Sequence, residues 1–204
     1  MISRLLAALA AAFLLAQPAL ALTDEERATV RAAEHYLQDI ETLRADFVQQ
    51  APNGGVAEGE LMLRRPGLIR FDYAPPSEIL LVSDGALVSF IDYEVGQLSQ
   101  WPLSDTPLSY LVRRDVDLFR DTMVDQVREE GNTIRFRVRD RDDPEQGAIT
   151  FHFTTDPMTL RGWQLVDAQE QETQVALTDL SLNRELPRDA FRFDEPKAPW
   201  APER

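Results

Sequence analysis

The segment Leu61–Gly85 constrains the fold most, because it contains three strand-length apolar runs separated by turn signals. Apolar and polar side chains alternate with the two-residue period of a strand in Leu61–Arg64 and again in Ile69–Tyr73. Ile79–Val82 is apolar throughout, and the Asp-Gly pair that follows it is typical of a hairpin turn. This pattern predicts neighbouring antiparallel strands that present one apolar face, and it does not suggest a catalytic cleft.

Residues 1–21 have the features of a secretory signal peptide. Arg4 supplies a positive start, Leu5–Leu15 is an apolar core, and Ala19-Leu20-Ala21 matches an A-x-A cleavage site. The apolar run is short for a membrane span, so an anchor that stays in place is the weaker alternative. We therefore expect residues 1–21 to be removed and residues 22–204 to form a single soluble, exported domain.

Composition excludes several functional classes. The chain has no cysteine, which rules out disulfides, thiol catalysis and cysteine metal sites. Its formal charge is −14, and removing Arg4 with the signal peptide makes it −15. Nucleic acid is an improbable partner for so acidic a chain, and anionic membrane surfaces repel it. We therefore expect no nucleic-acid binding and no stable insertion into a membrane.

Two segments are expected to be helical. Thr23-Asp24-Glu25-Glu26 has the form of a capping box, and apolar residues then recur at helical spacing as far as Leu43. Thr106-Pro107 predicts the start of a short second helix, with the hydroxyl as cap and proline at the first helical position. Helices with one apolar stripe usually pack on a sheet.

Strand periodicity dominates the rest of the chain. The clearest alternation is Ile134–Val138, where apolar residues alternate with arginines, and Phe191 and Phe193 suggest a last short strand. The predicted fold class is mainly β (α+β), an unclosed antiparallel barrel of about ten or eleven strands with an N-terminal helix and short helices as a lid. A curved sheet with a helical cover suits a ligand that is itself apolar.

No set of residues argues for an enzyme, a metal or a cofactor. His35 and His152 are the two histidines, and neither has a partner at ligand spacing; His152 is expected to face solvent. The motifs of nucleotide binding and of serine hydrolases do not occur. Asp84 is explained by its place in a hairpin turn. A hydrolase is therefore the weakest of the functions considered.

Arg65 is the exception among the charged residues. If its strand continues unbroken, Leu61, Leu63 and Arg65 share the covered face, where a guanidinium needs good hydrogen-bond partners. If the strand ends at Arg64, Arg65 belongs to an exposed turn. The spacing leaves the two alternatives open.

Several segments in order resemble a known family. They are Leu43–Gln50 (LRADFVQQ), Gly59-x-Leu-x-Leu-x-Arg-Pro-x-x-x-Arg-Phe71, Val82-Ser-Asp-Gly85, Gln97 and Thr106-Pro-Leu108. Together with the signal peptide they are similar to the periplasmic outer-membrane lipoprotein carrier proteins, the LolA family. The resemblance covers essentially all of residues 22–204, and the combined order is more specific than any one segment.

The resemblance implies a monomeric periplasmic carrier with an apolar cavity under a helical lid. Its partners would be acylated lipoproteins, the inner-membrane ABC transporter that releases them, and an outer-membrane receptor. The family's lid-latching arginine falls on Arg65. Strand parity and lid position give the residues expected to line the cavity for the acyl chains: Phe47, Leu61, Leu63, Ile69, Phe71, Leu80, Val82, Phe90, Trp101, Leu108 and Leu111. The alternative is a lipoprotein-sensing regulatory module of the same fold.

Overall fold

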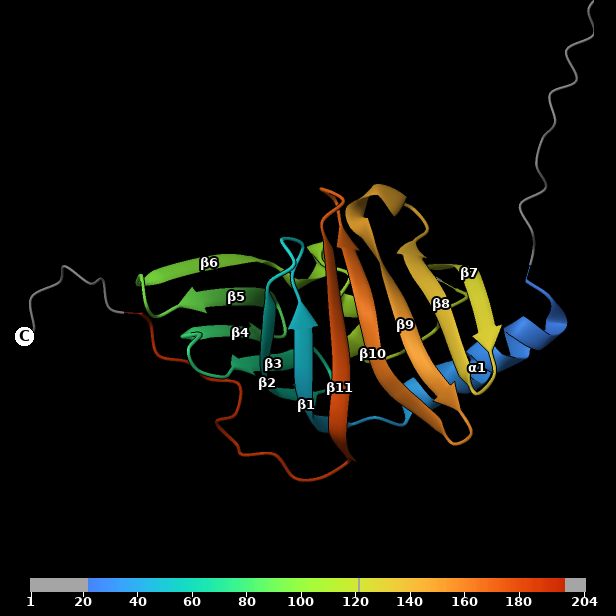
Figure 1. Ribbon diagram of the computed structural model, residues 1–204, viewed down its shortest axis with the longest axis horizontal. Coiled ribbons are helices and arrows are strands. Elements are labelled where there is room, and N and C mark those ends of the chain that lie inside the picture. Colours follow the sequence, from blue (N-terminus) through green and yellow to red (C-terminus); the bar gives the residue numbers. More distant parts are fainter. Residues whose placement is uncertain (1–21, 121, 197–204) are drawn as a thin grey trace, which may run out of the picture.

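The computed structural model describes residues 22–120 and 122–196, which form one antiparallel sheet of eleven strands with a helix and short helical segments (Figure 1). The expected signal peptide lies outside the described residues. In chain order the elements are α1 (Asp24–Gln38), β1 (Thr42–Gln50), β2 (Val56–Arg64), β3 (Leu68–Tyr73), β4 (Ile79–Asp84), β5 (Leu87–Asp92), β6 (Gln97–Pro102), η1 (Leu103–Asp105), α2 (Ser109–Val112), β7 (Thr122–Glu130), β8 (Thr133–Asp140), η2 (Pro144–Gln146), β9 (Gly147–Thr155), β10 (Met158–Asp167) and β11 (Glu172–Leu182).

The sheet is strongly curved and remains open. The strand order is β6-β5-β4-β3-β2-β1-β11-β10-β9-β8-β7, so β6 and β7 are the two edges and no pairing of described residues joins them. In Figure 1, β3 to β6 run almost horizontally, whereas β1 and β11 to β8 run steeply across the view. The change in strand direction wraps the sheet into an unclosed barrel, which confirms the predicted fold class.

The main core lies on the concave face of the sheet. Phe136, Phe151 and Phe153 are at most 1% exposed and form an aromatic cluster over β8 and β9. The apolar stripe of α1, which includes Val30 and Leu37, is buried in the same core, and Figure 1 shows α1 behind the strands β7 to β10. The alternation of Ile134–Val138 is therefore explained by one face against this core and one face outward.

The C-terminal segment covers part of the opposite, convex face. Leu80, Val82 and Ile91 form a separate buried cluster there, and Phe191 and Phe193 pack against it. The two phenylalanines do not form the last strand that the sequence suggested, since no ladder bond pairs their segment with the sheet. Their alternate spacing instead lets both rings cover apolar residues of β4 and β5.

Helix α1 is shorter than its apolar spacing predicts. It ends at Gln38, and β1 begins at Thr42, so Leu43 is a strand residue. The Asn183 side chain stops the helix from a distance: its Nδ2 donates to the Asp39 carbonyl, and its Oδ1 accepts the N–H of Glu41 at 2.8 Å. A contact 142 residues away in sequence is invisible to periodicity.

The second helical region also differs from its prediction. α2 comprises only Ser109–Val112, and Thr106 does not cap it, because the Thr106 hydroxyl donates to the Leu103 carbonyl. β7 was not predicted. Its alternation is interrupted by a register shift near Gln126, whose φ of +50° lies in the left-handed region.

Gly59 allows β1, β2 and β3 to pack closely. A Cβ at this position would lie 1.9 Å from the Asp72 carbonyl oxygen and 2.9 Å from the Phe47 ring. We predict that Gly59→Ala lowers the free energy of unfolding by about 3 kcal/mol, because the strand and ring must both shift. Urea unfolding followed by tryptophan fluorescence measures the change.

Gly55→Ala is the matched control, because its Cβ would meet only the Asn53 side chain. It should change stability by less than about 1 kcal/mol. Equal effects of the two substitutions would contradict the close packing at Gly59.

Candidate functional site: an apolar cavity under a latched lid

A cavity of about 620 Å³ opens on the concave side of the sheet. Its walls come from β3 to β6 on one side and from β10 and β11 on the other, and the segment Asp105–Leu108 covers it. The apolar lining residues are Phe71, Tyr73, Leu81, Phe90, Trp101, Pro107, Leu108, Trp163, Leu165, Ala168 and Val175. The volume lies within the range typical of small-molecule sites.

The floor of the cavity is aromatic and its rim is polar. The Phe71 ring packs edge-on against Trp163, with centroids 6.3 Å apart, and against Phe47 at 5.3 Å. The Tyr73 hydroxyl donates to Gln49 Oε1 at 2.8 Å, so its polar end is satisfied. The rim residues that carry charge or amide groups are Asp105, Gln146, Asp167 and Gln169. An apolar ligand with a polar end fits this arrangement.

The structure separates the residues expected in the cavity into three groups. Phe71, Phe90, Trp101 and Leu108 do line it. Five others lie in the adjoining packed core, and none of them borders the cavity: Phe47, Leu61, Leu63, Ile69 and Leu111.

Leu80 and Val82 belong to the separate buried cluster with Ile91 on the convex side, and they do not border this cavity. Ile79–Val82 has no polar alternation that would indicate its direction, and it is covered on both faces. Leu81, between the two, is the cavity residue. Leu81 pairs with Phe71, which also lines the cavity. This pairing follows from the register of β3 and β4 and cannot be read from the sequence of β4 alone.

Trp163, Leu165 and Val175 were missed as cavity residues. They stand at alternate positions of β10 and β11, and Trp163 pairs with Val175 across the two strands. Their two-residue spacing was a usable signal, but it did not show that these distant strands close one side of the cavity.

Arg65 joins the sheet to both helices. β2 ends at Arg64, yet the Arg65 side chain is not exposed in the turn: it reaches inward and donates only to backbone carbonyls. Its Nε and Nη2 donate to the Leu111 carbonyl of α2 at 3.0 and 2.8 Å, and its Nη1 donates to the Leu37 carbonyl of α1. Burial lowers the pKa of Arg65 to about 10, so the group is still a cation at neutral pH.

Two further contacts hold α2 in place. The backbone N–H of Gly67, in the same turn as Arg65, donates to the Val112 carbonyl at 2.7 Å. The Tyr110 hydroxyl donates to the Asp140 carboxylate at 3.3 Å, and burial together with that negative charge raises the pKa of Tyr110 to about 12. α2 is therefore tied to the β2–β3 turn and to the end of β8, next to the segment that covers the cavity.

Glu34 ties the segment after α2 to α1. Its side chain is 3% exposed, and its Oε2 accepts the Leu118 N–H at 2.6 Å while its Oε1 pairs with Arg31 at 2.7 Å. Gln38, one turn further along α1, donates to the Val116 carbonyl at 2.6 Å. Because Leu118 and Val116 are buried, these bonds satisfy backbone groups that water does not reach.

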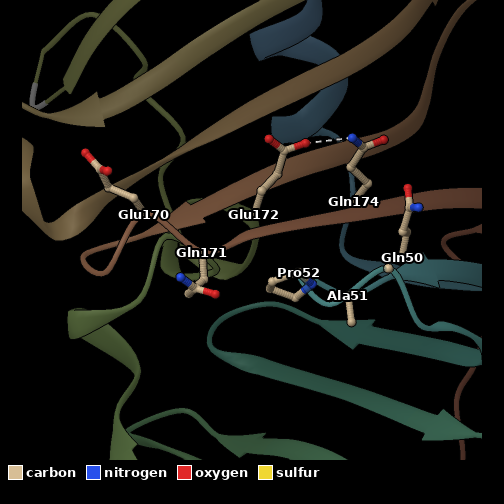
Figure 2. Close-up of a pocket in the computed structure, with 8 residues that line it drawn as sticks. Gln50, Ala51, Pro52, Glu170, Gln171, Glu172 and Gln174 are labelled. Carbon is tan, nitrogen blue, oxygen red and sulfur yellow. Dashed lines mark hydrogen bonds between the residues drawn. The ribbon is translucent and has the colours of Figure 1, made fainter.

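A second, polar pocket of about 430 Å³ lies at the turns that join β1 to β2 and β10 to β11 (Figure 2). Gln50, Glu172 and Gln174 border it, and Gln174 Nε2 donates to Glu172 Oε1 at 2.7 Å. Thr173 and Val175, the alternate residues of β11, line the apolar cavity instead. β11 thus separates a polar surface from an apolar one at the same end of the sheet.

The histidines do not form a site with other ligand residues. His152 lies beside Arg135 on the outward side of β9 and is partly buried; burial and that positive charge lower its pKa. Within residues 22–120 and 122–196, no three histidines, aspartates or glutamates are placed to hold a metal ion.

Comparisons with known proteins show the family of this chain. The family model for the outer membrane lipoprotein carrier protein LolA matches residues 38–194, which is more than half of the chain. The chain belongs to the LolA family. The match includes β1 to β11 and the lid segment, and it begins at the last residue of α1.

Relatives of this LolA family member are moderately similar in sequence. An outer-membrane lipoprotein carrier protein of Pseudomonas fluorescens is 29% identical over 171 residues, which is 79% of this chain and 81% of the relative. An uncharacterized protein of Rickettsia prowazekii is 24% identical over 173 residues, covering 84% and 79%. The crystal structure of a LolA superfamily protein from Nitrosomonas europaea aligns with a TM-score of 0.44 at 11% identity, covering 85% of this chain and 99% of that one.

Among the described residues, no helix has both the length and the apolar character needed to span a membrane.

Glu34 gives a test of the lid's attachment in this LolA family member. Glu34→Ala should leave the buried Leu118 N–H without its acceptor, at a cost of about 1–3 kcal/mol. We expect faster hydrogen exchange at Leu118 and a lower free energy of unfolding.

Glu34→Gln keeps an acceptor oxygen and should be intermediate. Glu25→Ala, an exposed change on the same helix, is the control and should leave Leu118 exchange unaltered. If the Leu118 N–H exchanges at the same rate in Glu34→Ala and in Glu25→Ala, the Glu34 bond does not hold the segment after α2.

Proposed function

We propose that the protein is a periplasmic carrier that binds the acyl chains of lipoproteins in its apolar cavity. It would receive them from an inner-membrane ABC exporter and deliver them to an outer-membrane receptor, after removal of residues 1–21 on export. The observation that carries the proposal is the 620 Å³ apolar cavity under a segment held by Arg65. Family membership and the name of the Pseudomonas relative support the choice of ligand.

The volume of the cavity indicates that cargo needs a more open state. At about 30 Å³ for each group the size of a water molecule, 620 Å³ holds roughly 20 methylene-sized groups. Three acyl chains with roughly 40 methylenes, at about 0.8 kcal/mol each, would give about 30 kcal/mol if fully buried. That value exceeds the practical limit of about 18–21 kcal/mol for non-covalent binding. A carrier that must also release its cargo therefore binds the chains incompletely and moves its lid.

The hydrogen bonds of Arg65 favour the return of the lid to its closed position. Hydrogen bonds to a charged group contribute about 1.5–3 kcal/mol each, and the half-buried position of Arg65 reduces their sum. A closed state favoured by roughly 2–4 kcal/mol can be shifted by a ligand that binds the open state better. In this mechanism the closed, empty state competes with cargo and drives release.

Binding of acylated peptide is the direct test. The mature protein should bind a hydrophobic fluorescent probe, and a triacylated lipopeptide should displace the probe while its deacylated form does not. Leu81→Glu places a charge in the cavity and should weaken binding at least about 10-fold, since desolvating a carboxylate against acyl chains is unfavourable.

Leu98→Glu, on an exposed edge-strand position, is the matched control and should bind normally. Equal displacement by the acylated and deacylated peptides would refute the proposed function.

Arg65→Leu tests release. The substitution removes the bonds to Leu37 and Leu111 and leaves an apolar side chain near the lid, so the empty closed state loses stability. The variant should load lipopeptide normally and transfer it to a purified acceptor about 10-fold more slowly or worse. Arg65→Lys should be intermediate, because an ammonium keeps the charge without the planar fork.

Arg192→Leu is an exposed control, since the described bonds of Arg192 are made by its backbone: its N–H donates to the Asp189 carbonyl, and its carbonyl accepts from Arg70. Normal transfer by Arg65→Leu would show that Arg65 has only a structural role in its turn.

A further inference from the structure

An arginine-lined pocket of about 460 Å³ lies at the seam that Arg65 closes. The end of α1, the end of β2, the following turn and the segment after α2 all border it, and Arg64, Arg65 and Arg114 come from three of these places. Glu41 is the one acidic residue in the lining. Three cations and one carboxylate make this a positive pocket on a chain whose formal charge is −14.

Among the described residues, Arg64 and Arg65 have carbonyl partners and neither pairs with a carboxylate. Arg65 donates to Leu37 and Leu111, and Arg64 donates to the carbonyls of Leu186 and Pro187 at 3.1 Å. In the part of the chain that the structure describes, no aspartate or glutamate lies within ion-pair distance of Arg65. A half-buried guanidinium that lacks a counter-ion would gain from a carboxylate in the pocket.

We propose that this pocket receives a carboxylate side chain from a partner protein, and that the carboxylate draws Arg65 off α1 and α2 and so opens the lid. The inference rests on the proposed function, because it concerns the trigger of the same lid. It assigns to the pocket a ligand class, an aspartate or glutamate side chain presented by an exporter or a receptor.

The geometry of a guanidinium favours an exchange in which Arg65 leaves the two carbonyls and binds a carboxylate. A guanidinium binds a carboxylate through two parallel N–H···O bonds, and such charge-assisted bonds are stronger than those to a neutral carbonyl. When Arg65 turns to the carboxylate, the carbonyls of Leu37 and Leu111 lose their donor. α2 then keeps the Gly67–Val112 and Tyr110–Asp140 bonds, which lie at the two sides of the released contact. Arg114 is exposed at the pocket and can steer an acidic group toward it.

A protein carboxylate fits better than the phosphate of a membrane lipid. An anionic bilayer meets the whole surface of the protein, and a chain with a charge of −14 is repelled by it. A single side chain samples only the local potential, because charges beyond about 8 Å are screened at physiological ionic strength. Glu41 adds a further repulsion that grows with the charge of the anion and so favours a singly charged group.

The experiment uses the mature protein without lipid and observes the Arg65 Nε–H resonance. An acetylated and amidated tetrapeptide with one aspartate among three glycines should shift this resonance saturably, whereas the matched peptide with asparagine in place of the aspartate should not. Bound peptide should also speed hydrogen exchange of the Arg113 N–H, which caps α2 by donating to the Ser109 carbonyl, by about 10-fold. Arg114→Gln should weaken peptide binding about 10-fold, and Arg188→Gln, an exposed change on the C-terminal segment, should not.

Three results would overturn the proposal. They are no saturable shift with the aspartate peptide, a shift without faster exchange at Arg113, and binding of inorganic phosphate as tight as that of the peptide. This experiment contains no acyl chain. A negative result here therefore concerns only the arginine pocket, and a negative result with lipopeptide concerns only the proposed carrier function.

Discussion

The bonds from Arg65 to the carbonyls of Leu37 and Leu111 connect the three parts on which the cavity depends. The sheet alone presents an open concave face, and α1 and the segment around α2 cover it from different sides. A guanidinium at the end of β2 reaches both covers because its donors diverge from one planar group. Since the acceptors are neutral carbonyls, these bonds hold the sheet, α1 and α2 together without the strength of a buried ion pair.

The cavity exists because packing is uneven along the concave face. Over β8 and β9 the apolar side of α1 meets Phe136, Phe151 and Phe153, and this region is densely filled. Over β3 to β6 the cover is the segment Leu103–Val112, whose helical turns are too short to fill the same width. Aromatic walls such as Trp101 and Trp163 therefore remain partly unopposed, and the space between them is available to an apolar ligand.

The C-terminal segment covers the convex side of the sheet behind the cavity. Phe191 and Phe193 cover Leu80, Val82 and Ile91 on the convex side of β4 and β5, whereas Leu81 and Phe90 of the same strands line the cavity. This cover accounts for the continuous apolar run Ile79–Val82, which a sheet with one wet face would not need. The C-terminal segment thus stabilises the wall of the cavity from behind, through Arg64 and Arg70, which donate to its carbonyls.

Sequence alone determined the open antiparallel sheet, the helical cover and part of the aromatic lining, because two-residue alternation places side chains of residues such as Phe71 and Trp101 on one face. The family was also recognisable, from short segments that recur in order. Tertiary structure decided what local pattern cannot express. Asn183 ends α1, a contact from the far end of the chain, and the uniform apolar run of β4 left Leu81 indistinguishable from Leu80 and Val82. Arg65 showed both alternatives in one residue: its strand does end at Arg64, and its guanidinium is nevertheless turned inward. That outcome depends on two carbonyls, 28 and 46 residues away, which only folding brings within reach of one side chain.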